Sequence, residues 1–285
     1  MPDATVIPIS GGDDPGRKAA SRAAREAGAT GPRRARAPKP PTQDVVEAAT
    51  DAMELIAEGE HDIDGSPSRL DEGLAEWLDF LRRRLTGEYQ VDDFGFDPEL
   101  TDRVLLAPLR PLYEKWFRVE TRGIENVPSE GGALVVANHS GTIALDSVMT
   151  QLALHDHHPA HRNLRMLGAN LVFQTPLMGE IARKSGHTLA CNPDAERLLS
   201  GGEIVGVWPE GFKGIGKNYS ERYKLQRFGR GGFVATALKT KTPIVPTAIV
   251  GAEEIYPMIA NAKTLARLFG LPYFPITPTF PWLGP

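Results

Sequence analysis

The sequence of 285 residues contains a single cysteine, Cys191. One cysteine excludes an intramolecular disulfide framework and a zinc site built from cysteine thiolates, and it is typical of proteins from reducing compartments. No uninterrupted apolar run reaches the roughly 18–20 residues that a membrane-spanning helix needs. The early basic residues are not followed by an apolar stretch, so we expect no secretory signal peptide. The sequence therefore predicts a cytoplasmic protein.

Acidic residues are concentrated in one part of the chain. Residues 1–41 hold eight basic and four acidic side chains, residues 42–102 hold four basic and eighteen acidic, and residues 103–285 hold twenty basic and fourteen acidic. An acidic block of this size argues against nucleic acid as a partner. The basic C-terminal part suits an anionic substrate or an anionic membrane surface.

Composition and periodicity divide the chain into three parts. Residues 1–41 are rich in Gly, Pro, Ala and Arg, which predicts a disordered basic tail. Within residues 42–102, apolar residues recur every three or four positions over 42–59 and 68–85, which predicts an acidic helical appendage. We expect residues 103–285 to form the main domain. Because the chain stops soon after an apolar, proline-rich stretch, we also expect this domain to be truncated at its C-terminus.

The main part alternates strand and helix patterns, which indicates an α/β domain with a mixed sheet and helices on both of its faces. The predicted strands are 117–121, 133–137, 164–167, 204–208 and 244–250. The predicted helices are 146–154, 176–184, 193–199 and 228–239.

Residues 98–117 form an amphipathic stretch in which aromatic and basic side chains are interleaved, with Pro108 and Pro111 expected to kink it. This composition suits a helix lying in a membrane interface. A helix packed on the domain core explains the pattern equally well. Together with the apolar end of the chain, the first alternative predicts peripheral binding to anionic lipid on the cytoplasmic face of a membrane.

Candidate chemistry follows the predicted strand 133–137. Asn138, His139 and Ser140 enter a glycine-containing loop, and Asp146 comes seven residues after the histidine. A histidine that leaves a buried strand is placed for general base work. Contact with Asp146 requires the loop to fold back, because seven residues along an unbroken helix would separate the two side chains by about 10 Å.

A second constellation follows the predicted strand 204–208. The segment holds Glu210, Gly211, Lys213 and Lys217, and its backbone amides and lysines could bind phosphate. Gly211 to Lys217 also fits the start of a nucleotide-binding loop, but Asn218 stands where Ser or Thr should bind magnesium. A set of four basic residues comes next and offers an alternative phosphate site: Arg222, Lys224, Arg227 and Arg230.

These motifs, taken in order, resemble the lysophospholipid and glycerol-phosphate acyltransferase family, the PlsC-like group. The resemblance covers about residues 116–255 and rests on three stretches. They are Asn138-His139 with Asp146, then Trp208-Pro209-Glu210-Gly211-Phe212-Lys213, then Pro243-Ile244-Val245-Pro246. Six residues separate the histidine from the aspartate where the family has four, and Lys213 stands where the family has arginine.

The resemblance implies an O-acyltransferase acting in phospholipid synthesis. His139 would deprotonate the hydroxyl of a glycerol-phosphate or lysophospholipid acceptor, and Asp146 would orient it. The hydroxyl would attack the thioester of acyl-CoA or acyl carrier protein, with no cofactor and no metal. Substrate contacts would come from six residues: Asn138, Ser140, Glu210, Gly211, Lys213 and Lys217. A thioesterase that uses the same His–Asp pair and a non-catalytic lipid-binding protein are the alternatives.

Two other features suggest chemistry less strongly. Residues 155–161 contain four histidines and an aspartate, but they include Pro159 and lack a helical zinc-binding arrangement, so we interpret them as a surface loop. Nothing next to Cys191 in sequence would lower the pKa of its thiol, which argues against a nucleophile. Ser140 lacks the glycines of a nucleophile elbow.

Overall fold

The computed structural model describes residues 69–229 and 231–280, which fall into two compact units divided between Tyr89 and Gln90. The described part of the first unit contains one helix, α3 (Arg69–Thr86), which confirms the helix predicted over 68–85. Arg82 and Arg83 bond to Asp79 one turn earlier on its surface. The predicted tail 1–41 and helix 42–59 lie outside the described residues.

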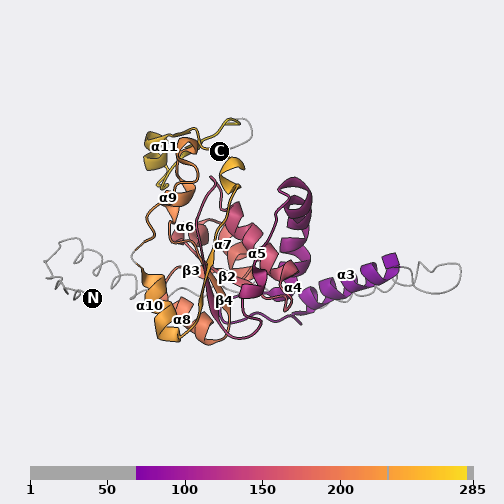
Figure 1. Cartoon of the computed structure of the whole chain (residues 1–285). Helices are drawn as coiled ribbons and strands as arrows, with labels where there is room; N and C mark the ends of the chain where they lie inside the picture. Colours follow the sequence, from indigo (N-terminus) through magenta and orange to yellow (C-terminus); the bar gives the residue numbers. More distant parts are fainter. Residues whose placement is uncertain (1–68, 230, 281–285) are drawn as a thin grey trace, which may run out of the picture. The chain divides into compact units, whose positions relative to one another are not determined.

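The second unit is built on a five-stranded sheet of order β3-β2-β4-β1-β5 (Figure 1). Its strands are β1 (Ala133–Ala137), β2 (Leu164–Gly168), β3 (Thr188–Leu189), β4 (Ile204–Val207) and β5 (Ile244–Thr247). Every neighbouring pair in this sheet is parallel. The α/β class is confirmed, and the main sheet is parallel where the sequence predicts a mixed one. The antiparallel pairing occurs in a separate pair, β6 (Ala260–Asn261) and β7 (Pro275–Ile276).

Helices cover both faces of this sheet, as expected. The α-helices of the second unit are α4 (Pro98–Leu100), α5 (Leu145–His157), α6 (Asn170–Gln174), α7 (Met178–Lys184), α8 (Asn192–Ser200), α9 (Phe212–Ile215), α10 (Gly232–Thr240) and α11 (Lys263–Leu268). On one face Leu154 of α5 packs with Val135 and Leu164. On the other face Leu198 of α8 and Ala237 of α10 pack with strand residues. Alternate residues of each buried strand therefore belong to two different cores.

The amphipathic stretch 98–117 packs on the outer side of α5. It runs through α4, a π-helical turn (Thr101–Leu106), a 3-10 turn (Ala107–Leu109) and a second π-helical turn (Leu112–Trp116), so the helix is irregular around its prolines. Leu106 and Tyr113 are buried against Met149 and Leu152 of α5. The segment therefore matches the core-packed alternative, although Trp116 remains 75% exposed.

The strand predicted over 117–121 does not form. Arg118 has a φ of 50°, and the amide of Val119 donates to the carbonyl of Tyr113. The chain therefore turns back on the end of the helical segment, and Phe117 and Val119 pack against the cluster beside α5. Their apolar alternation reflects this packing and no strand pairing.

The domain begins earlier than the predicted boundary at 103. Asp92 accepts a hydrogen bond from the buried Arg165 of β2, and Thr101 donates to the carbonyl of Lys184 at the end of α7. Asp97 caps α4 through the amide of Leu100. Residues 90–102 thus pack with the α/β unit, and their acidic side chains partly serve to pair its cations.

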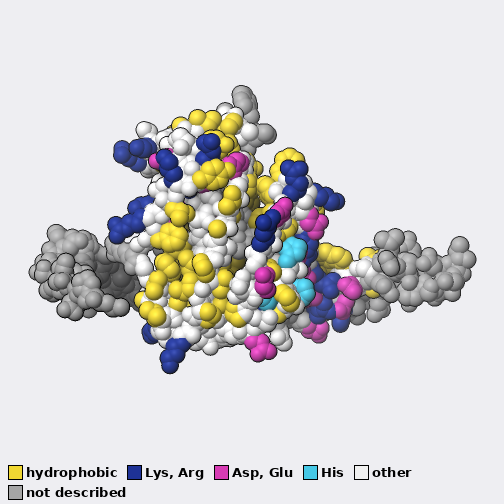
Figure 2. All heavy atoms as spheres, viewed as in Figure 1, with side chains coloured by type: hydrophobic (Ala, Val, Ile, Leu, Met, Phe, Trp, Pro, Cys, Tyr) yellow, Lys and Arg dark blue, Asp and Glu magenta, His cyan; other side chains and the backbone are white. Residues whose placement is uncertain are grey.

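Strand β5 lies at the edge of the sheet, where a proline is tolerated because one side of the strand needs no partner. The amide of Leu134 donates to the carbonyl of Pro243, so in a parallel ladder Ile244 and Pro246 direct their backbone groups away from β1. Exposed apolar side chains continue onto α10, where Leu238 is 75% exposed. Figure 2 shows this apolar surface over α10 and the neighbouring strands.

Candidate functional site

The candidate site lies where three neighbouring strands end. Because β4, β1 and β5 are parallel, the segments that follow them meet at one edge of the sheet. Asn138 and His139 follow β1, Glu210 follows β4, and Ile249 follows β5. The sequence motifs, which lie up to 111 positions apart, are thereby brought into direct hydrogen-bond contact.

His139 and Asp146 are in contact despite the six residues between them. Nδ1 of His139 lies 2.8 Å from Oδ2 of Asp146. The loop folds back at Gly141, which has a φ of 85° and where a Cβ would lie 2.8 Å from the carbonyl of Ala252. Only glycine fits this turn without a clash. The turn brings Asp146 back to His139 although six residues separate them.

The carboxylate of Asp146 is buried and surrounded by donors. Oδ2 accepts from the amide of Ser140 at 3.0 Å in addition to His139, and Oδ1 accepts from the amide of Ser147 at 2.8 Å. Asp146 also lies in the first turn of α5, where the helix dipole favours negative charge. These contacts stabilise the ionised carboxylate and fix its orientation.

This carboxylate determines the tautomer of the neighbouring imidazole. An ionised Asp146 can only accept, so Nδ1 of His139 carries the proton and Nε2 presents its lone pair. The His139 side chain is 12% exposed, and no hydrogen bond within the described residues engages Nε2. The arrangement suits a general base.

Glu210 holds the histidine from the opposite side. Its Oε1 accepts from the backbone amide of His139 at 3.0 Å, and its Oε2 accepts from the amide of Gln226 at 2.6 Å. Because the side chain is buried and both oxygens are used, Glu210 is positioned to hold the site together. A direct contact with substrate, as the sequence predicts, would have to compete with these bonds.

Asn138 also serves the framework. Its side-chain amide donates to the carbonyl of Ile249 at 2.9 Å, and its side-chain oxygen accepts from the amide of Ile249 at 2.7 Å. This reciprocal pair joins the end of β1 to the segment that follows β5. Ser140 reaches the site through its backbone amide, which donates to Asp146.

The two predicted phosphate-binding lysines have opposite environments. Lys213 is exposed on α9 and forms no ion pair within the described residues. The side chain of Lys217 is 6% exposed, with Nζ 2.6 Å from Glu253 and 3.0 Å from the carbonyl of Lys224. The structure therefore leaves Lys213 available for an anionic ligand, whereas it uses Lys217 to hold the loop.

Close packing against His139 depends on Gly214, a residue for which the sequence motifs predict no role in the site. A Cβ on Gly214 of α9 would lie 2.4 Å from the carbonyl oxygen of His139 and 2.9 Å from Cβ of Glu210. Gly211 begins this turn with a φ of 55° and a ψ of −141°, a conformation that suits glycine. The spacing of glycines 211, 214 and 216 is the sequence signal for this close approach.

Trp208 forms one wall beside the histidine. Its ring centroid lies 5.9 Å from that of His139, and the side chain belongs to the core around β1. Its indole nitrogen is buried without a hydrogen-bond partner in the described structure. A nearby cavity of about 600 Å³ is bounded by β5, α5 and residues 121–127, and none of the predicted site residues lines it.

The other candidate motifs have structural roles. His158 is buried and bonds the carbonyl of Val127, and Asp156 pairs with Arg110, an interaction that lowers the pKa of Asp156 to about 2. Among the described residues, no group of three or more histidine, cysteine, aspartate or glutamate side chains could hold a metal ion. Burial raises the pKa of the Cys191 thiol, which disfavours the thiolate.

Known proteins share the part of the sequence that builds this site. A family model described as Acyltransferase matches residues 118–250. An uncharacterized protein of Mycobacterium tuberculosis is 57% identical over 222 residues, which are 78% of this chain and 62% of the relative. A protein of Mycobacterium leprae, also uncharacterized, is 58% identical over 218 residues, 76% of this chain and 59% of the relative.

A more distant relative has a functional name. The bovine DGAT1/2-independent enzyme synthesizing storage lipids is 24% identical over 171 residues, which cover 58% of this chain and 48% of that enzyme. The chain therefore spans about 60% of the mycobacterial relatives and about half of the bovine enzyme. No solved structure shows significant similarity to the chain.

Proposed function

We propose that the chain, whose residues 118–250 match the Acyltransferase family model, transfers a fatty acyl group from a thioester donor to the hydroxyl of a lipid acceptor. The donor is acyl-CoA or acyl carrier protein. The acceptor is a glycerol phosphate or a lysophospholipid, such as a 1-acylglycerol 3-phosphate. The 2.8 Å contact between His139 and Asp146 at the strand ends carries this proposal.

In the proposed reaction His139 acts as the base. Its Nε2 accepts the proton of the acceptor hydroxyl while the hydroxyl oxygen attacks the thioester carbonyl. The tetrahedral intermediate then collapses, the carbon–sulfur bond breaks, and the proton passes from His139 to the departing thiolate. An ester and a free thiol result, and the histidine returns to its starting state.

Asp146 stabilises the imidazolium that forms during the first step. The carboxylate is held by two backbone amides and the start of α5, so it keeps its position when the histidine charges. Glu210 fixes the backbone of His139 and thereby its approach to the substrate. We expect Lys213 to attract the phosphate of the acceptor, because it is exposed and free of an ion pair within the described residues.

The decisive experiment measures thiol release from a long-chain acyl-CoA with a panel of acceptors. The panel comprises glycerol 3-phosphate, lysophosphatidate, lysophosphatidylcholine and the phosphate-free monoacylglycerol. We expect release that depends on the acceptor and is faster with phosphate-bearing acceptors. Free fatty acid released without any acceptor would instead indicate a thioesterase.

Asp146→Asn provides the matched variant for this assay. The amide keeps the shape of the side chain but can hold the opposite tautomer of His139, so we expect a loss of roughly 10²–10⁴-fold in turnover. Ser147→Ala serves as the control, because the amide that Ser147 donates to Asp146 belongs to the backbone. Turnover of Asp146→Asn within a fewfold of the wild type would refute the proposed mechanism.

A further inference from the structure

Residues 256–280 leave the main sheet and form a small excursion of their own. It consists of β6, α11 and β7, with the two strands paired antiparallel from Ala260 to Ile276. Its 25 residues include two basic side chains, Lys263 and Arg267, and no acidic one. It thus differs in composition from the rest of the second unit.

Large apolar side chains are exposed on this excursion. Leu268 and Phe269, at the end of α11, are 74% and 62% exposed, and Ile259 beside β6 is 62% exposed. Both basic residues are exposed, and neither forms an ion pair within the described part of the chain. In Figure 2 dark blue basic side chains gather in the upper left, around the place where Figure 1 draws α11.

The exposed apolar residues stand on a packed base. The ring of Phe269 stacks on that of Phe274 at a centroid distance of 6.0 Å, and Phe280 meets Phe274 edge-on at 6.0 Å. Ala266 of α11 is buried. The excursion therefore presents Leu268 and Phe269 as a defined apolar tip.

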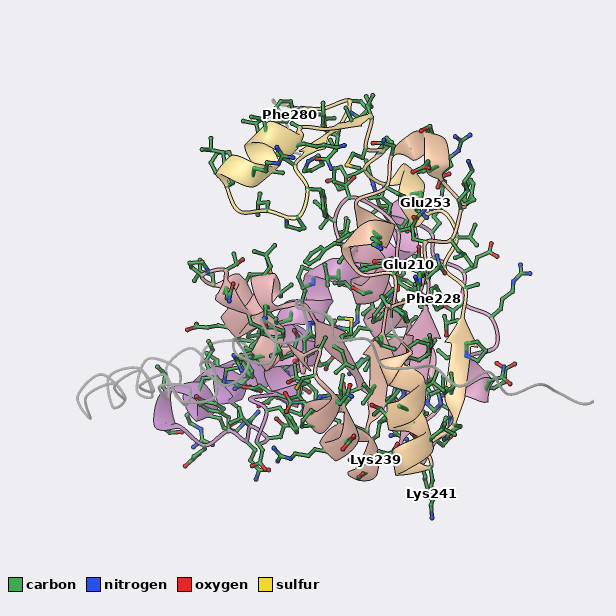
Figure 3. The ribbon with its side chains drawn as sticks, turned by 90° about the vertical axis from the view of Figure 1, so that its left-hand side faces the viewer. Glu210, Phe228, Lys239, Lys241, Glu253 and Phe280 are labelled. Carbon is green, nitrogen blue, oxygen red and sulfur yellow. The ribbon has the colours of Figure 1, made fainter. Side chains whose placement is uncertain are left out.

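This base is attached to the candidate site. The hydroxyl of Tyr273 donates to the carbonyl of Thr142, in the loop between His139 and Asp146, at 2.8 Å. Burial raises the pKa of Tyr273 to about 12, so this donor keeps its proton at neutral pH. Figure 3 shows Phe280 at the top of the unit, Glu253 and then Glu210 below it, and Lys239 and Lys241 at the bottom.

We propose that the excursion 256–280 docks on an anionic lipid surface, with Leu268 and Phe269 entering the interface and Lys263 and Arg267 contacting the headgroups. Apolar side chains at a tip, with cations beside them that form no ion pair among the described residues, match the chemistry of such a surface. This inference deepens the proposed function, because it brings the loop that holds His139 to the membrane where lipid acceptors reside.

The composition favours an anionic lipid surface over an acidic protein partner. An acidic protein would pair with the two cations but would offer nothing to two large exposed apolar side chains at the tip. The stretch 98–117 is less suited to lipid, since Leu106 and Tyr113 are buried against α5 and only its end exposes Trp116 strongly. No helix in residues 69–229 and 231–280 combines the length and apolarity needed to cross a bilayer.

The test measures binding of the full chain to sedimented vesicles, with no substrate present. We expect binding to phosphatidylcholine vesicles that contain phosphatidylglycerol, and weaker binding to phosphatidylcholine alone. Leu268→Ser with Phe269→Ser should weaken binding about tenfold or more, because it removes the inserted apolar surface. Lys263→Gln with Arg267→Gln should weaken binding to the anionic vesicles by roughly 30-fold and leave binding to the neutral ones unaffected.

Leu238→Ser is the matched control, since Leu238 is as exposed as Leu268 but lies on α10. Phe269→Trp adds a direct readout, because lipid contact should shift the emission of the new tryptophan to shorter wavelength. Unchanged binding of the Leu268/Phe269 variant, an equal loss in Leu238→Ser or Trp116→Ser, or no emission shift would overturn the docking proposal. Because no turnover is measured, each result is independent of whether the proposed acyl transfer is correct.

Discussion

Two histidines of this domain contact side chains of the same helix, α5, but one partner is a carboxylate and the other is a neutral amide. His139 contacts the carboxylate of Asp146 in the first turn of α5. His187 contacts the side-chain oxygen of Gln151, in the second turn of the same helix, at 3.1 Å. Burial, with the nearby Arg165 as a smaller contribution, lowers the pKa of His187 to about 4.

The difference lies in the charge of the partner. A carboxylate stabilises the protonated imidazole, whereas an amide and a neighbouring guanidinium do not. Gln151 donates its own amide to the carbonyl of Ser185, so its oxygen must accept from His187, which is held as a neutral structural residue. A histidine can therefore serve as a base or as a fixed hydrogen-bond donor according to its neighbours alone.

Substitution of each histidine tests this comparison most directly. We expect His139→Ala to lower acyl transfer by roughly 10²–10⁴-fold, because the proposed general base is lost. His187→Gln can still donate to Gln151 and should retain most of the activity. Thiol release per folded protein, with folding checked by circular dichroism, measures both. More than half of the wild-type turnover in His139→Ala would contradict the assignment.

The stability of the domain should depend on pH through His187. Its folded pKa of about 4 lies below the ordinary value of 6.5, so between these two values the unfolded chain binds more protons. Stability should therefore be retained above pH 6.5 and be lost as the pH falls towards 4, by at most about 3 kcal/mol. Urea titrations across this range should show a smaller loss for His187→Gln, and an identical loss would argue against it.

A glycine lies beside each histidine site, and the two should respond differently. Gly214→Ala would push against the carbonyl of His139, so we expect activity to fall about tenfold or more through misplacement of the base. Gly186→Ala would crowd Arg165 and Phe96 at a φ of 89°, and should cost about 1–3 kcal/mol of stability with activity retained. Equal activity losses in the two variants, measured on folded protein, would remove the distinction.

Among these variants, substitution of Lys213 should have the smallest effect, and it should act on binding of the acceptor. We expect Lys213→Ala to raise the KM for phosphate-bearing acceptors several-fold with little change in kcat, the pattern of lost uniform binding. Lys213→Arg should retain affinity. Lys239→Ala, at the opposite end of the unit in Figure 3, serves as the control. An unchanged KM, or an equal rise for monoacylglycerol, would contradict the role of Lys213.

The sequence alone predicted the α/β class, four of the five strands of the main sheet and the histidine motif, because strands and helices impose periods of two and 3.6 residues that survive in the pattern. It placed strands at 133–137 and 164–167 within one residue of β1 and β2. It failed at 117–121, where Phe117 and Val119 alternate because both contact the cluster beside α5.

Long-range contacts were decided by the tertiary structure. Lys213 and Lys217 lie four positions apart in one basic loop, yet only the fold places Glu253 against Lys217 and leaves Lys213 exposed. The bonds from Glu210 to the amides of His139 and Gln226 likewise join residues distant in sequence. Local periodicity indicates which side chains are buried. The partner of a buried charge is determined only in the folded chain, because parallel strands bring loops that are distant in sequence to one edge of the sheet.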